Sequence, residues 1–156
     1  MDKSNPPTSF GVFKPVDHVV LAFENTAVTQ DVTDQLIAQG FSAADVVHYS
    51  PQEMKNQVDA NLLTASALAS LGQDLNLVKA HRALAELGCN FLVVYAPQAE
   101  QVQRIQTIAN TMKAKSAQRY GSLIVEELLD ADLNQHQVFE SPDRGLDADA
   151  AQQRTA

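Results

Sequence analysis

The stretch that most constrains the fold is an apolar run at residues 89–96, opened by Gly88 and closed by Pro97. The run is short, rich in valine and aromatic residues, and continuous rather than alternating between apolar and polar residues. These properties are typical of a strand that is buried on both faces of a sheet. Helical sequence lies on both sides of it, so the pattern predicts a layered α/β domain with this strand at its centre.

Two helix signals precede this run in the first 41 residues. Residues 17–23 predict a first strand, and Asn25 or Thr26 is then placed to cap a helix with apolar residues on one face. Gly40 ends that helix as a left-handed C-cap, and Phe41 is the apolar residue that commonly folds back onto the last turn. The sequence therefore predicts a strand followed by an amphipathic helix.

A capping box gives the clearest local signal. Ser50 and Glu53 have the spacing of a reciprocal cap, and Pro51 occupies the first helical position. The box directly follows a short predicted strand at 46–49. We therefore expect a helical pair over 51–87, divided by a glycine, between the second and third strands.

The remainder of the chain predicts one more helix and one more strand. After Pro97 the periodicity indicates a long helix that runs to Tyr120, and residues 123–128 indicate the last strand. The proline-containing residues 1–15 are predicted to be a flexible leader. The acidic residues 131–156 are predicted to be a disordered tail, because they are poor in apolar side chains. A single α/β domain is thus expected over residues 16–130.

The element order is β-α-β, a helical pair, then β-α-β. Two such halves suit a ferredoxin-like sandwich, with the helical pair inserted between the second and third strands. The alternative is a small four-stranded doubly wound parallel sheet with helices on both faces. Continuous apolar strands favour the alternative, because a ferredoxin-like sheet leaves one face bare; the inserted helices or a partner subunit would cover that face. We take the ferredoxin-like fold as the first interpretation.

Three stretches carry a family likeness: Gly40-Phe41 after the first helix, residues 72–97, and residues 117–128. Through them the segment 17–128 resembles a group of uncharacterised small bacterial α/β proteins related to general-stress-protein-17M-like domains. The resemblance implies a small, stress-linked, soluble domain. It carries no catalytic residue over to this chain.

Composition and motifs exclude several function classes. The net charge of −8 argues against a nucleic-acid or anionic-membrane partner, since both are bound through basic patches. No run approaches the roughly 18 apolar residues of a membrane span, and the N-terminus lacks the pattern of a signal peptide. Neither G-x-G-x-x-G nor a P-loop occurs, and the histidines form no HxH or HExxH spacing. We therefore predict a cytoplasmic protein without a cofactor or metal.

Four residues are candidates for ligand binding. Tyr49 and Tyr95 end the second and third strands, where a parallel sheet would bring them together in one crevice. His81 and Arg82 precede the central strand, as an acid/base group and a cation that could grip a small anionic ligand. The alternative is that all four have structural roles. The tyrosines would bury their rings and expose their hydroxyls to water, the histidine would border a packing face of its helix, and the arginine would be solvated.

Cys89 has no CxxC partner, and it follows a helix C-terminus, which disfavours a thiolate. We expect it to be a small buried apolar residue.

Two functions from different classes follow from these observations. The first is a non-enzymatic regulatory or interaction domain, a homodimer joined through its sheet or its inserted helices. The second is a small-molecule-binding protein or small enzyme with a crevice near Tyr49, Tyr95 and His81. Regular core patterning and the lack of a cluster of reactive groups favour the first, and whether the protein is an enzyme stays open.

Overall fold

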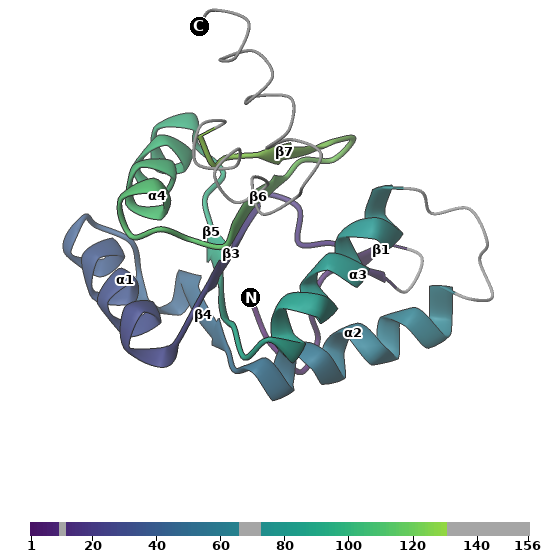
Figure 1. The fold of residues 1–156 in the computed structure, drawn as a ribbon. Helices are drawn as coiled ribbons and strands as arrows, with labels where there is room; N and C mark the ends of the chain where they lie inside the picture. The colour runs from purple at the N-terminus through teal and green to yellow at the C-terminus, as the bar shows by residue number, and fades with distance from the viewer. Residues whose placement is uncertain (10–11, 66–72, 131–156) are drawn as a thin grey trace, which may run out of the picture.

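A five-stranded antiparallel sheet forms the centre of the protein. The computed structural model describes residues 1–9, 12–65 and 73–130 (Figure 1). The strands lie in the order β4-β5-β3-β6-β7, and every neighbouring pair is antiparallel. Their bounds are β3 (His18–Phe23), β4 (Val46–Tyr49), β5 (Asn90–Tyr95), β6 (Ser116–Tyr120) and β7 (Val125–Glu127).

Helices cover both faces of this sheet. One layer contains α1 (Thr26–Ala38) and α4 (Ala99–Thr111), and the other contains α2 (Pro51–Ala65) and α3 (Gln73–Glu86), which pack against each other (Figure 1). A short 3-10 helix, η1 (Ala43–Asp45), leads into β4. The strands β1 (Thr8–Ser9) and β2 (Val12–Phe13) pair with each other, and β2 lies beside α2 and α3. The protein therefore has three layers.

The predicted α/β class is confirmed, but the parallel alternative is wrong. Each strand of the large sheet runs against its neighbours, so the carboxyl ends of the strands do not share one edge. The predicted helical pair over 51–87 is present as α2 and α3, and it covers one face of the sheet. A plain four-stranded ferredoxin-like sandwich does not describe this sheet, which has a fifth strand and a helix layer on each face.

The strands β3 and β5 are buried on both faces, as the apolar runs predict. All six residues of β3 are buried, and in β5 only Tyr95 is exposed. Side chains alternate between faces along a strand. Val19 and Leu21 thus pack towards α1 and α4, whereas Val20 and Ala22 pack towards α2 and α3. β3 rather than β5 occupies the middle of the five strands.

The predicted start and stop signals of α1 are confirmed. The side chain of Asn25 accepts a hydrogen bond from the backbone N–H of Val28 at 3.0 Å. Gly40 has a φ of +101°, a conformation that side chains with a Cβ disfavour. The N–H of Phe41 then donates to the Leu36 carbonyl at 3.1 Å, and the Phe41 ring is buried in the core. These contacts fix where α1 leaves the sheet.

The predicted capping box of α2 is also present. The N–H of Glu53 donates to Ser50 Oγ at 3.1 Å, and the N–H of Ser50 donates to Glu53 Oε2 at 2.8 Å. This reciprocal pair satisfies two backbone donors at the helix start. The chain therefore turns from β4 into α2 within two residues, and this holds Tyr49 beside the first turns of α2.

The predicted helix from Pro97 to Tyr120 is wrong in its second half. α4 ends at Thr111, and residues 116–120 form strand β6, which pairs with β3. The backbone turns at Lys113, which has a φ of +56°. The buried strand β3 needs hydrogen-bond partners on both sides, and β6 supplies the second set. The last predicted strand, 123–128, is present as the shorter β7.

The ends of the chain were predicted to be a flexible leader and a disordered tail. In the leader, the Lys3 ammonium lies 2.9 Å from Glu53 Oε1 on α2, and Met1 packs against the core between the sheet and α2 and α3. The mobility of residues 1–15 stays a prediction. The predicted tail, 131–156, lies outside the described residues, as does the predicted glycine break between α2 and α3.

Candidate functional site

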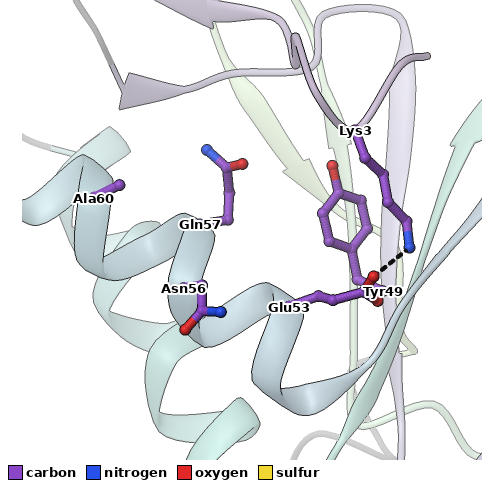
Figure 2. Close-up of a pocket in the computed structure, with 6 residues that line it drawn as sticks. All are labelled: Lys3, Tyr49, Glu53, Asn56, Gln57 and Ala60. Carbon is purple, nitrogen blue, oxygen red and sulfur yellow. Dashed lines mark hydrogen bonds and ion pairs between the residues drawn. The ribbon is translucent and has the colours of Figure 1, made fainter.

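A hollow of about 330 Å³ lies beside Tyr49, where β4 ends and α2 begins (Figure 2). Three parts of the chain meet there: the leader, the last residue of β4, and the first turns of α2. The residues that line it are Lys3, Tyr49, Glu53, Asn56, Gln57 and Ala60. We call this space the Tyr49 hollow.

Tyr49 lines the hollow and is almost fully buried. Figure 2 shows the side chain of Lys3 running beside the ring of Tyr49 towards Glu53. The Lys3 ammonium lies 5.1 Å from the ring centroid, within the range of a cation–π contact. Burial raises the pKa of Tyr49 to about 12, and the carboxylates of Glu53 and Asp2 add to this effect. The phenol is therefore protonated at neutral pH.

Glu53 is held as a carboxylate at the rim of the hollow. The hydrogen bond from the Ser50 N–H, then the one from Lys3, lower its pKa below the usual range. Lys3 and Glu53, which both line the hollow, thus form an ion pair at 2.9 Å beside Tyr49 (Figure 2). A small anion that enters here would compete with Glu53 for the ammonium of Lys3.

His81 lies inside the core rather than in a cleft. Its side chain is 1% exposed, and its ring lies 5.8 Å from Phe91 and 6.5 Å from Tyr120, measured between centroids. Burial lowers its pKa to about 4, although the hydrogen bond to Gln118 acts in the opposite direction. Since an amide oxygen only accepts, Nε2 of His81 donates to Gln118 Oε1 at 3.4 Å. His81 is therefore a neutral core residue.

Arg82 points to solvent from the outer side of α3. Its guanidinium lies 2.7 Å from Asp59 of α2 and 2.7 Å from Glu86 one turn further along α3. Asp59 also pairs with Lys55 at 3.5 Å. The Asp59 carboxylate, first through its hydrogen bond, raises the pKa of Arg82. The predicted anion-gripping cation is already engaged by two carboxylates.

Tyr95 lies far from Tyr49 along the sheet. β4 pairs with β5 so that Tyr49 is opposite Phe91, while Tyr95 is opposite His18 of β3. Tyr95 is four positions beyond Phe91 along β5, which corresponds to roughly 13 Å. The ring of Tyr95, 39% exposed, lies 5.2 Å from that of His18. The shared crevice expected for Tyr49 and Tyr95 is wrong, because the strands alternate in direction.

Besides the Tyr49 hollow and a hollow of about 340 Å³ lined by Lys79, Arg82, Ala83 and Glu86, the structure contains a polar hollow that was not predicted from the sequence. It has a volume of about 130 Å³ and lies between α1 and the edge strand β4, and we call it the α1–β4 groove. His48 lines it and donates from Nε2 to Asn90 Oδ1 at 2.8 Å. Its lining residues are Thr26, Thr29, Gln30, Thr33, Val46 and His48. The threonines recur at helical spacing on α1, and that spacing was a usable signal.

Cys89 is buried, as expected, and desolvation raises the pKa of its thiol. Within the described ranges of the chain, no three side chains of the His, Cys, Asp and Glu types come together as a metal site. The helices of those ranges include none that is long and apolar enough to cross a bilayer.

Comparisons with known proteins identify no relative. No family model matches this chain, and no curated protein or solved structure matches it either. The likeness to general-stress-protein-17M-like domains therefore remains an expectation from the sequence.

Proposed function

We propose that this protein is a small non-enzymatic regulatory or interaction domain that works as a homodimer joined through an edge of its sheet. One observation carries this proposal. Helices cover both faces of the sheet, so, within the described residues, its edges are the places where strand backbone is open to another chain. Unpaired edges readily accept a strand from another polypeptide.

The inserted helices are a weaker candidate for the contact between chains. α2 and α3 use their apolar sides against the sheet, where Met54, Val58, Val78 and Ala85 are buried. Their outer sides carry the ion pairs of Asp59 with Lys55 and Arg82. Exposed ion pairs contribute little to association, and the surface they occupy is polar.

We also propose that the fold is a ferredoxin-like sandwich with additional elements. β3, α1 and β4 form one β-α-β unit, and β5, α4 and β6 form another. The strand order β4-β5-β3-β6 interleaves the two units, which supports a ferredoxin-like sandwich to which α2, α3 and β7 have been added. The proposed link to stress rests on the sequence resemblance alone, and the proposed cytoplasmic location rests on composition and on the lack of a signal-peptide pattern.

The test is the mass of the protein in solution. Size-exclusion chromatography with light scattering should give the mass of two 16.9 kDa chains at micromolar concentration, falling to one chain on dilution. A single chain at every concentration up to about 100 μM would remove the proposal, since a weaker association would have little effect in a cell.

A second function is favoured by the Tyr49 hollow. Its volume of about 330 Å³ is within the range of small-molecule sites, and Lys3 supplies a cation for a small anionic ligand. A thermal-shift screen of small anions should find compounds that stabilise the wild type and do not stabilise Lys3→Gln. Arg104→Gln is the matched control, because it removes one exposed cation elsewhere. Equal shifts in all three proteins would exclude Lys3 from the binding site.

A further inference from the structure

The two edges of the sheet differ in charge. β4 contains two valines, a histidine and a tyrosine, whereas β7 contains Glu126 and Glu127 in its three residues. Natural edge strands are commonly protected from pairing by charged side chains, prolines or bulges. β7 carries such protection and β4 does not. Two copies of β7 side by side would also bring carboxylates against each other, which destabilises a strand pair.

The outer side of β4 is open in the described part of the chain, where β5 is the one strand that pairs with it. Successive residues of an antiparallel strand direct their N–H and C=O groups to alternate sides. Part of the backbone of residues 46–48 therefore points away from β5. These groups can bond to a further strand without any change in the sheet.

We infer that β4 pairs with the β4 strand of a second copy, antiparallel and centred on Val47. This inference rests on the proposed homodimer and assigns its interface. The two sheets then become one continuous sheet across a two-fold axis perpendicular to it. Residues directly opposite each other across such an axis lie on the same face, so Val47 faces its own equivalent.

The side chains that would face each other favour a pairing centred on Val47 over one centred on His48. A pairing centred on His48 would place two imidazole rings opposite each other on the α1 face. Centred on Val47, the pairing places two β-branched side chains opposite each other on the α2–α3 face. β-Branched cross-strand pairs are favourable. On the other face, Val46 of each copy lies opposite His48 of the other.

The same register joins the two α1–β4 grooves. Val46 and His48 line the groove of each copy and lie on the face that carries α1. Across the axis they are opposite the corresponding residues of the second copy, so the dimer has one cleft in place of two separate grooves. Thr29 and Thr33 line it with hydroxyls that donate to backbone carbonyls within α1, which leaves their oxygens as acceptors.

The decisive experiment uses opposite charges at one position. Val47→Lys and Val47→Glu should each give a single chain by light scattering, because two like charges then face each other at about 5 Å. An equimolar mixture should recover the dimer, since Lys and Glu face each other in this register. We expect the dissociation constant of each variant alone to be at least tenfold above that of the mixture. Circular dichroism checks that each variant is folded.

A measurement on the wild type keeps the test independent of these substitutions. Backbone amides of β4 should exchange more slowly at a concentration that favours the dimer than at a dilute one, while those of β7 should not change. Glu126→Lys is the matched control on the opposite edge, and it should leave the dimer intact.

Several results would overturn the inference. Folded Val47→Lys that remains a dimer would exclude the β4 interface while leaving the proposed homodimer standing. Loss of the dimer in Leu123→Ser, at the tip of the β6–β7 hairpin where Leu123 is 91% exposed, would assign the contact to the other edge. A mixture that fails to recover the dimer would exclude the Val47 register. A wild type that is a single chain at all concentrations would remove both proposals.

Discussion

The two faces of the sheet are built from different side chains. Among the described residues, the hydrophobic cluster towards α1 and α4 contains aliphatic residues, alanines and phenylalanines, and the buried polar residues Thr29 and Asn90 lie beside it. The cluster towards α2 and α3 contains Tyr49, Tyr120 and Cys89, and it encloses His81. On the first face, Thr29 donates to the Asn25 carbonyl and Asn90 accepts from His48. On the second face a histidine lies inside the core, so hydrogen bonds as well as shape set the geometry there.

A chain of polar side chains crosses the second face from the core to the surface. His81 donates to Gln118, and the Gln118 amide donates to Glu127 Oε2 at 3.0 Å. The other oxygen of Glu127 accepts from the N–H of Leu129 at 3.2 Å. α3 is thereby tied to β6 and β7. The contact between α3 and the sheet therefore includes a buried histidine whose pKa is lowered by burial, so this contact depends on pH.

The largest expected effect compares one phenylalanine from each face. Phe23 and Phe91 are both fully buried, and truncation of such residues to alanine costs about 3–5 kcal/mol. Phe23→Ala should fall at the upper end, because its cluster is the larger of the two among the described residues. Phe91→Ala should fall at the lower end, because α2 and α3 pack against each other and can move together to fill the cavity that the lost ring leaves. Chemical denaturation measures both values.

Hydrogen exchange locates the damage in each variant. Phe91→Ala should lose protection first in α2 and α3, and Phe23→Ala should lose it throughout the sheet. Loss of protection in the same elements in both variants would contradict the difference between the two faces of the sheet.

The next effect is the pH dependence that His81 gives to the second face. Its pKa is about 4 in the folded protein, against 6.5 for an ordinary histidine. The folded state thus binds this proton more weakly than the unfolded state, so stability is lost as pH falls from about 6.5 towards 4. The pKa difference corresponds to about 3 kcal/mol over that window. Denaturation of the wild type at pH 7 and pH 4.5 should show much of this loss.

Two variants isolate the contribution of His81 from that of the carboxylates. His81→Leu and His81→Gln do not titrate, so each should lose less stability than the wild type between pH 7 and pH 4.5. His81→Gln keeps a donor for Gln118 and controls for the hydrogen bond. An identical pH dependence in the wild type and both variants would show that His81 does not couple folding to pH.

The predictions from sequence were most accurate for features that depend on residues close together in the chain. The Asn25 cap, the Gly40 turn and the Ser50–Glu53 box each involve atoms within a few residues, and all three are present. Residues 116–120 were predicted to be helical, since Ser116 continues the apolar stripe of α4. Pairing with β3 outweighs that local preference, and such long-range pairing has no signature in a short window.

The candidate site was harder to predict than the fold. Tyr49 does line a hollow, but the parallel geometry used to group it with Tyr95 is absent. Lys3 and Glu53, which define the Tyr49 hollow, are fifty residues apart in sequence. Their contact depends on where the leader lies against α2. No spacing rule connects such residues, so the hollow could be found only from the three-dimensional arrangement.

The smallest expected effect compares one exposed arginine from each helix layer. Arg82 bridges α3 to α2 through the Asp59 carboxylate, and Arg104 bridges α4 to α1 through the Gln39 carbonyl at 3.4 Å. Arg82→Gln should lower Tm by no more than about 2 °C, and 1 M NaCl should abolish the difference from the wild type, because salt screens exposed charge pairs. Arg104→Gln should show no such salt dependence, since its acceptor is uncharged. Equal salt dependence in both variants would mean that the ion pairs of α2 and α3 add nothing specific to their layer.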